Sequence, residues 1–391
     1  MEQTASWQPL AGIRVLDFSV LLPGPLATVM LADLGAEVVK VEPVTGDNAR
    51  NVPALGPIFR NANRNKRSLA LNLKHPDSAS IIERLAARSD VVVETFRPGV
   101  AERLGVGHEK LQALHPGLIY CSLSGYGQSG PWRDAPGHDL NYLAAAGAFT
   151  FSGHWFGKPR RSGLPVADMS GGSLAACAIL SALQERSRTG RGVYLDMSLF
   201  EATLFFTAAR HGLDRDRFIP DHPYPTNDLF ETADERMVAL GVGTEEHFWI
   251  NFRNAVAPIA PEILEPRFQT DAGRRQHGDE LATWLQRLFR TRPATEWMEL
   301  LQRHDVPVSL CLTPKEASEA EHVRARRMVD GSGTEATVPF PVWADGQRGG
   351  RMERPAPQLG QDTADILTEI GFSKAEVGDF KRAGIVSGEL G

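Results

Sequence analysis

Short runs of β-branched and apolar residues alternate with longer apolar or amphipathic segments along the first half of the chain. Runs such as residues 91–94 are typical of strands buried on both faces. Segments such as residues 26–34, which follow Pro23-Gly24-Pro25, favour helices, because proline suits the first helical turn. We expect strands at residues 13–18, 38–42, 69–73, 91–94, 118–122 and 192–196, and helices at residues 26–34, 76–88, 109–114, 174–183 and 199–209. This alternation predicts a large α/β domain with a Rossmann-like, doubly wound sheet that is mainly parallel.

The pattern changes at the breaker-rich stretch His222-Pro223-Tyr224-Pro225-Thr226-Asn227. Beyond it, Trp249, Trp284 and Trp297 mark the apolar faces of three amphipathic helices, and we expect these aromatic stripes to be core. Further strands are expected at residues 237–242, 308–312 and 337–342, and closing helices at residues 363–370 and 373–382. The pattern therefore predicts a large domain over residues 1–221, a smaller α/β domain over 222–330, and a C-terminal segment, 331–391, that returns to the large domain.

Composition excludes several classes of protein. Apolar residues make up 42% of the 391 residues and charged residues 23%, which is typical of a globular chain. The formal charge of −6 and the lack of a long basic stretch argue against a nucleic-acid partner. No signal segment or membrane-spanning apolar run is evident, so no membrane partner is expected. Cys121, Cys177 and Cys311 form neither a disulfide framework nor a metal-binding spacing, which favours a reducing, cytoplasmic location.

Candidate chemistry lies in two stretches, Gly137-His138-Asp139-Leu140-Asn141-Tyr142-Leu143 and Val166-Ala167-Asp168-Met169-Ser170-Gly171-Gly172. Asp168 precedes a Ser-Gly-Gly turn and an apolar helix. It therefore lies at or just before a helix N-terminus, where free backbone N–H groups favour an anionic oxygen. A carboxylate beside such donors, with the His138 imidazole opposite, is suited to moving a proton on a carbon next to a carbonyl. Taken alone, Asp168 is more often a helix cap and His138 a hydrogen-bonded loop residue.

Glycines and basic residues follow several expected strands: Lys40, then Thr95-Phe96-Arg97, then Ser124-Gly125-Tyr126-Gly127. Ligands of doubly wound sheets bind beyond the carboxyl ends of the strands, so these residues suit a ligand that carries phosphate and adenine. The turn after the first strand is not GxGxxG, and a dinucleotide fingerprint is therefore absent. Charged loop tips that are merely solvated would give the same pattern.

A series of motifs in the same order resembles family III CoA-transferases and their relative α-methylacyl-CoA racemase, most densely between residues 10 and 206. The motifs are Leu10-Ala11-Gly12-Ile13-Arg14-Val15-Leu16-Asp17-Phe18, Pro23-Gly24-Pro25, the run Ala32 to Pro43, Asn65-Lys66-Arg67-Ser68, Phe96-Arg97-Pro98-Gly99 and Ser124-Gly125-Tyr126-Gly127-Gln128. The resemblance implies a large CoA-binding domain with a smaller α/β domain, and a homodimer of two interlocked chains.

The resemblance also implies roles for three residues. Asp168 matches the catalytic aspartate of both branches; in transferases this residue attacks the thioester and later carries CoA as an aspartyl thioester. His138 matches the histidine that pairs with the aspartate in racemases. Glu245, in Thr244-Glu245-Glu246-His247-Phe248, resembles the glutamate that orients the histidine, supplied by the same or the partner chain.

By the same resemblance, CoA enters as part of the substrate, and neither a permanently bound cofactor nor a metal is expected. The residues that match CoA contacts are Lys40, Ala70, Leu71, Asn72, Leu73, Lys74, Thr95, Phe96, Arg97, Arg103, Gly137, Asp139, Asn141 and Tyr142. Pro43 stands where many relatives have a phosphate-binding arginine, and Arg50 or Lys40 is the candidate replacement. Arg160 and Arg161 are candidate contacts for a carboxylated acyl group, in a loop that solvation alone would also explain.

Three functions follow from these residues. The Gly-His-Asp context favours a racemase or epimerase of 2-methylacyl-CoA thioesters that works by α-proton transfer through an enolate. The alternative is a family III CoA-transferase that moves CoA from an acyl-CoA to a carboxylic acid. A CoA-binding protein without turnover is the third possibility, and the intact Asp168 argues against it.

Overall fold

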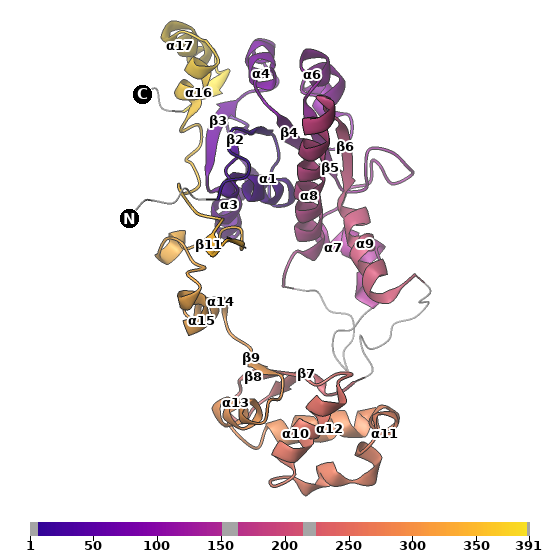
Figure 1. Cartoon of the computed structure of the whole chain (residues 1–391). Helices are drawn as coiled ribbons and strands as arrows, with labels where there is room; N and C mark the ends of the chain where they lie inside the picture. Colours follow the sequence, from indigo (N-terminus) through magenta and orange to yellow (C-terminus); the bar gives the residue numbers. More distant parts are fainter. Residues whose placement is uncertain (1–6, 151–162, 214–223, 389–391) are drawn as a thin grey trace. The chain divides into compact units, whose positions relative to one another are not determined.

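The computed structural model describes residues 7–150, 163–213 and 224–388, and the contacts within them divide into two units (Figure 1). The larger unit contains the described residues up to 147, those from 163 to 212, and those from 322 onward. The smaller unit contains the remaining described residues, chiefly 224–321. The change of unit at 321–322 precedes the expected boundary at 330, because residues 322–330 already contact the larger unit.

A seven-stranded sheet forms the centre of the larger unit, in the order β12-β3-β2-β1-β4-β5-β6. Every neighbouring pair is parallel except β12 with β3. The strands are β1 (Arg14–Asp17), β2 (Glu37–Glu42), β3 (Lys66–Leu71), β4 (Val91–Glu94), β5 (Ile119–Ser124), β6 (Tyr194–Ser198) and β12 (Val386–Ser387). The chain moves outward from β1 to β3 and then returns to place β4 on the other side of β1. The strand order therefore reverses between the paired strands β1 and β4. Ligands of such sheets bind beyond the carboxyl ends of the strands at this point.

Helices cover both faces of this sheet, as expected for parallel strands that are buried on both sides. Helices α4, α6 and α16 pack on one face, where Leu16, Leu71 and Val92 point into a shared core. Helices α1 and α8 pack against each other and against the strands on the other face (Figure 1). The helices are α1 (Pro23–Asp33), α2 (Asn48–Asn51), α3 (Gly56–Asn63), α4 (Ser78–Ala86), α5 (Val100–Arg103), α6 (His108–Leu114), α7 (Asp139–Ala145), α8 (Val166–Thr189), α9 (Leu199–His211), α15 (Glu321–Ala325), α16 (Thr363–Glu369) and α17 (Lys374–Arg382).

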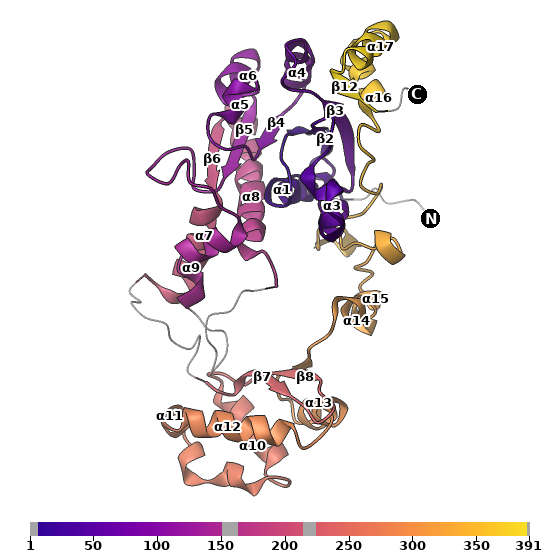
Figure 2. The same ribbon diagram turned by 180° about the vertical axis from the view of Figure 1, so that it is seen from behind.

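The C-terminal segment lies against β3: α16 and β12 contact that strand, and α17 packs on α16 and β12 (Figure 2). Asp362 accepts a hydrogen bond from the Ser68 N–H at 2.9 Å. Asn65 donates to the Arg351 carbonyl at 2.7 Å and accepts from the Glu353 N–H at 2.8 Å. These bonds join residues about 290 positions apart. The last part of the chain therefore completes the edge of the sheet.

Helix α8 is longer than the sequence indicates, because Ser170-Gly171-Gly172 is helical and not a turn. A Cβ on Gly172 would lie 2.5 Å from the Pro23 carbonyl oxygen, and one on Gly171 would lie 2.3 Å from the Leu199 side chain. The two glycines therefore let α8 pack closely against α1 and α9 without a side chain between them. Contrary to expectation, α8 is long and apolar enough to cross a membrane by length and composition alone; 44% of its most apolar window is buried inside the protein.

The close packing at Gly172 predicts a stability effect. Gly172→Ala should lower the free energy of unfolding by about 1–3 kcal/mol, because backbone must move to admit the methyl group. Gly378→Ala in α17 is the control, since its Cβ would meet only the flexible end of Arg382 at 3.4 Å. That variant should be neutral or more stable by about 0.5–1 kcal/mol. Denaturant unfolding of both variants tests this, and equal stabilities would contradict it.

The smaller unit has a three-stranded antiparallel sheet, β7-β8-β9, covered by helices. Its elements are β7 (Asn227–Glu231), β8 (Met237–Gly241), α10 (Glu246–Val256), α11 (Asp271–Gln276), α12 (Gly278–Phe289), α13 (Ala294–Arg303), β9 (Val308–Leu310) and α14 (Pro314–Ser318). Trp249 and Trp297 are fully buried in one apolar core with Phe252 and Phe289. The interpretation of these two aromatic stripes as core is confirmed, while Trp284 is only partly buried.

Candidate active site

A cavity of about 540 Å³ opens at the carboxyl ends of β1, β4 and β5 in the larger unit. Its lining brings together the two residues expected to do the chemistry, His138 and Asp168. The rest of the lining consists of Val20, Leu21, Pro23, Thr95, Phe96, Arg97, Pro98, Leu123, Ser124, Gly125, Arg133, Ala135, Pro136, Gly137, Asn141, Tyr142 and Leu199. The cavity thus lies where the strand order reverses, as the physics of doubly wound sheets predicts.

His138 precedes the first residue of α7, and its backbone is held from two sides. Its N–H donates to Asn141 Oδ1 at 3.0 Å, and its carbonyl accepts the Asn141 N–H at 2.8 Å. The hydroxyl of Tyr142 donates to the carbonyl of Gly137 at 2.7 Å. The His138 side chain is exposed at the cavity wall. Asn141 and Tyr142, which also line the cavity, therefore fix the loop that carries the imidazole.

Two glycines allow Tyr142 to take this position. A Cβ on Gly137 would lie 2.7 Å from the Tyr142 ring, and one on Gly125 would lie 2.6 Å from its hydroxyl oxygen. Any larger residue at either position would displace the ring. The glycines of the Ser-Gly-Tyr-Gly and Gly-His-Asp motifs are thus explained by packing against one tyrosine.

Asp168 is the third residue of α8 and is partly buried. Burial, and then the negative charge of Asp139, raise the pKa of Asp168 to about 7. At neutral pH this carboxyl is therefore present in both the ionised and the protonated form. A group in this state can accept a proton in one direction of a reaction and donate one in the other.

Three of the first four backbone N–H groups of α8 are not free for an anionic oxygen, contrary to expectation. Asp139 Oδ1 accepts the Ala167 N–H at 2.7 Å and the Asp168 N–H at 3.3 Å, and the Met169 N–H donates to the Pro165 carbonyl at 2.9 Å. The carboxylate of Asp139 thus accepts the N–H groups that we expected to bind the enolate oxygen. Asp139 itself is absent from the cavity lining and contacts α8, and its expected contact with CoA stays a prediction.

Arginines supply the positive charge of the cavity. Arg97 and Arg133 line it, and the sequence reasoning missed Arg133. Arg103 Nη1 lies 3.5 Å, and Arg133 Nη2 3.8 Å, from the position that a Cβ on Gly99 would take, so the two guanidinium groups converge there. Arg133 pairs with the exposed Asp134 at 3.5 Å. The arrangement can hold an anionic group such as a phosphate or a carboxylate.

Lys40 does not reach a ligand, and this expectation was wrong. Its side chain is fully buried, donates to the Ser19 carbonyl at 2.8 Å and pairs with Asp47 at 3.1 Å. Asp47 in turn accepts the N–H of Leu21, a cavity residue with a positive φ of 63°. Lys40 therefore supports the cavity wall from behind. Arg50, the other candidate replacement at Pro43, is instead bonded to Glu42 at 2.7 and 2.8 Å.

This placement predicts different outcomes for two lysines. Lys40→Met should lower the free energy of unfolding by about 3–5 kcal/mol, because it leaves the buried Asp47 carboxylate without its partner. The exposed Lys74 remains a candidate phosphate contact. Lys74→Met should therefore raise KM for acyl-CoA and leave the unfolding curve unchanged. Denaturant melts and steady-state kinetics on both variants make the comparison; a KM effect without destabilisation in Lys40→Met would contradict the assignment.

The expected CoA contacts on β3 need a second correction. The side chains of Ala70 and Leu71 are fully buried, and both residues pair with β12 on one side while Ala70 pairs with β2 on the other. These two residues therefore belong to the sheet and its core. Asn72, Leu73 and Lys74 follow the strand, with Leu73 packed against the core. They form a loop outside the cavity lining.

Glu245 belongs to the smaller unit, where it is exposed and precedes the first residue of α10. The neighbouring Glu246 is engaged by Arg274 in an ion pair. The orienting role of Glu245 stays a prediction. Arg160 and Arg161 lie outside the residues that the structure describes.

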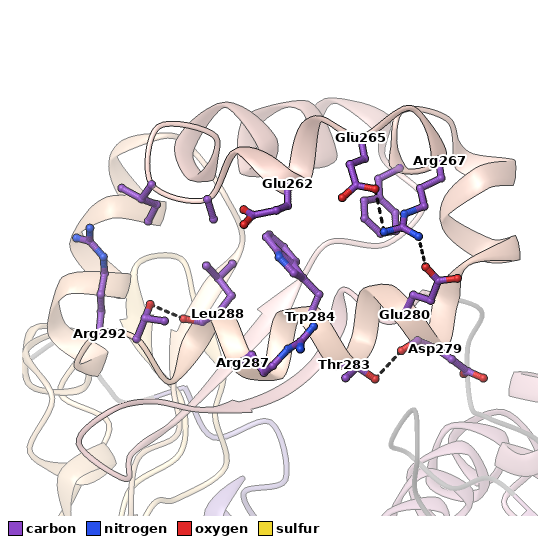
Figure 3. Close-up of a pocket in the computed structure, with 14 residues that line it drawn as sticks. Glu262, Glu265, Arg267, Asp279, Glu280, Thr283, Trp284, Arg287, Leu288 and Arg292 are labelled. Carbon is purple, nitrogen blue, oxygen red and sulfur yellow. Dashed lines mark hydrogen bonds and ion pairs between the residues drawn. The ribbon is translucent and has the colours of Figure 1, made fainter.

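A larger hollow of about 1020 Å³ lies in the smaller unit, between α12 and the turns at Pro261–Leu264 and Pro266–Phe268 (Figure 3). Three of its charged side chains engage one another, because Arg267 pairs with both Glu265 and Glu280 (Figure 3). None of the residues expected to act in the chemistry lines it. The cavity at the β1–β4 switch is therefore the candidate active site.

A carboxyl and an imidazole that line one cavity at the switch point of an α/β sheet, with arginines beside them, are typical of enzymes that handle anionic ligands. Residues 10–363 match the model of CoA-transferase family III, and the chain belongs to this family. The acetyl-CoA:oxalate CoA-transferase of Acetobacter aceti is 33% identical over 384 residues, covering 94% of this chain and 97% of the relative. The alpha-methylacyl-CoA racemase of Mus musculus is 33% identical over 379 residues, covering 94% and 95%.

The fold agrees with this membership. A CAIB/BAIF family protein from Brucella suis has a solved structure that superposes with a TM-score of 0.82 at 26% identity, covering 93% of this chain and 99% of that one. The resemblance inferred from the motifs is confirmed. Acyl-CoA substrates are consistent with the family, whose members include both racemases and CoA-transferases at similar identity to this chain.

Proposed function

We propose that this protein is a racemase or epimerase of 2-methylacyl-CoA thioesters. The observation that carries the proposal is the cavity that His138 and Asp168 line together. Removing the weakly acidic α-proton of a thioester needs a base on one side of the carbon and an acid on the other. An imidazole and a carboxyl group that line the same cavity can meet that need, and they exchange roles for the opposite enantiomer.

The proton transfers follow from this pairing. Asp168 as carboxylate removes the α-proton of one enantiomer, and the C–H electron pair moves into the enolate. The His138 imidazolium then gives its proton to the opposite side of the α-carbon. Asn141 lines the same wall, and its Oδ1 accepts the backbone N–H of His138; its amide nitrogen is our candidate donor to the enolate oxygen. The pKa of Asp168 near 7 supports the alternation, since neither protonation state is scarce at neutral pH.

The alternative is a CoA-transferase, which the similarity to the oxalate enzyme supports as strongly as the similarity to the racemase. Asp168 would then attack the thioester carbonyl and expel the CoA thiolate, which leaves an anhydride between Asp168 and the acyl group. The thiolate would next attack the aspartyl carbonyl of the anhydride, releasing the acyl carboxylate and leaving an aspartyl-CoA thioester. This route gives His138 no proton to carry at the α-carbon. The role of His138 therefore separates the two functions.

We further propose that CoA binds along Thr95, Phe96, Arg97, Arg103 and the loop 72–74, as substrate and not as a resident cofactor. A homodimer is supported by large apolar side chains that are exposed on α8, α9 and the segment just before α8: Leu164, Val166, Met169, Phe205 and Phe206. A second copy of the chain would remove these side chains from water. The three cysteines are free, which suits the proposed cytoplasmic location.

One incubation separates the candidate functions. The protein is mixed with a single enantiomer of a 2-methylacyl-CoA in deuterated water, with and without an acceptor carboxylate. Deuterium at the α-carbon together with inversion, independent of acceptor, supports the racemase. CoA transfer that requires the acceptor, without deuterium at the α-carbon, supports the transferase. If neither activity is seen, a CoA-binding protein without turnover remains.

A further inference from the structure

One carboxylate joins the two halves of the candidate site. Asp139 directly follows His138 and is the first residue of α7, while its Oδ1 accepts the N–H groups of Ala167 and Asp168 at 2.7 and 3.3 Å. The residues it connects are 28 and 29 positions away along the chain. These hydrogen bonds connect the segment that contains His138 to the first turn of α8, which contains Asp168.

The same contact changes the electrostatics at the start of α8. The N-terminus of a helix ordinarily stabilises a carboxylate in its first turn, through the dipole and the free N–H groups. Here a second carboxylate takes up those N–H groups, so Asp168 ionises next to a fixed negative charge. Burial raises the pKa of Asp168 most, and the negative charge of Asp139 raises it further. The other ionisable groups on the cavity wall are His138 just before α7, Tyr142 within α7, Arg97 after β4, and Arg133.

We propose that Asp139 is a positioning residue, which sets the separation of His138 and Asp168 and keeps Asp168 able to exchange its proton with substrate at neutral pH. The inference rests on the proposed acyl-CoA chemistry. It assigns Asp139 a role other than contact with CoA, and a role beyond capping α8. If Asp139 were only a helix cap, replacing it would change the stability of α8 but not the pH dependence of the reaction.

Two variants separate these roles. Asp139→Asn keeps an oxygen that can accept the Ala167 N–H but removes the charge. Its unfolding curve should match the wild type, while the acidic limb of the pH–kcat profile for α-deuterium exchange moves to lower pH by on the order of one unit. Asp139→Ala removes the fastening as well and should lower kcat about 10- to 100-fold, with KM for the acyl-CoA changed less than about threefold. Asp365→Asn, at an exposed aspartate in the first turn of α16 and outside the cavity lining, is the matched control and should leave the profile in place.

A second readout does not depend on turnover. The carboxyl carbon of Asp168 can be titrated by NMR in protein labelled with ¹³C-aspartate, with the signal assigned by its loss in Asp168→Asn. The titration midpoint should fall in Asp139→Asn and stay unchanged in Asp365→Asn. An unmoved midpoint overturns the inference, as does a KM increase at constant kcat, which would make Asp139 a ligand contact. Absence of exchange in the wild type, with a shifted midpoint in the variant, would overturn the proposed function and leave the electrostatic link intact.

Discussion

Replacing Asp168 with asparagine is expected to lower kcat for α-deuterium exchange coupled to inversion by at least about 10³-fold. Asparagine has the shape of aspartate but cannot carry the proton. The variant should also lose acceptor-dependent CoA transfer, if the protein has that activity, because an amide is not the nucleophile that forms the anhydride. The effect is the largest we expect, since both candidate reactions pass through this side chain.

The variant should fold normally, which makes the loss interpretable. The bonds that fasten the start of α8 come from the backbone N–H groups of Ala167 and Asp168, and the Asp168→Asn variant retains both. Removing a half-buried group whose pKa is raised by burial and by Asp139 should leave stability unchanged or slightly higher at neutral pH. Denaturant melts check the fold. Activity within tenfold of wild type would remove Asp168 from the mechanism.

Replacing His138 with alanine is expected to reduce racemisation by about 10²- to 10⁴-fold, the range typical of a lost general acid or base. The backbone bonds that hold the loop, from His138 N–H to Asn141 and from Tyr142 to the Gly137 carbonyl, do not use the imidazole. The cavity wall should therefore stay in place. Any CoA transfer between an acyl-CoA and a carboxylate should be spared, because that route takes no proton from the α-carbon.

The kinetics of both activities, measured side by side, give the result. His304→Ala is the matched control, since His304 is an exposed residue that follows α13 in the smaller unit. It should leave both activities unchanged. If His138→Ala abolished transfer and racemisation equally, the imidazole would be needed for a step common to both routes, and the assignment of His138 to the α-proton would be wrong.

The sheet could be predicted from the sequence because its strands are apolar on both faces, as in Val91–Glu94, where expectation and structure coincide. The third strand was placed three residues too late. It begins at Lys66, a fully buried lysine whose Nζ lies 3.0 Å from Asp17. A buried ion pair makes a strand look polar, and its partner lies on another strand, so hydrophobic periodicity cannot detect it.

Other differences also come from contacts between distant residues. Helix α7 was missed because only Tyr142 and Leu143 of its seven residues are buried, which leaves no amphipathic pattern to detect. The strand expected at 337–342 is only an isolated bridge between Asp330 and Thr337. The two candidate catalytic residues, His138 and Asp168, could be identified from the sequence, because both lie in motifs that resemble those of the family. The role of Lys40 and the contact of Asp139 with α8 could not, because each depends on a partner that folding brings close.

The central claim is that an imidazole and a carboxyl group act on opposite sides of one α-carbon. The most direct test measures wash-in of deuterium separately from the (R)- and (S)-2-methylacyl-CoA in His138→Ala and in Asp168→Asn. Each variant keeps one base, so each should exchange the α-proton of a single enantiomer without inverting it. We predict that the two variants exchange the α-proton of opposite enantiomers. Exchange of the same enantiomer by both variants, or of both enantiomers by either one, would contradict it.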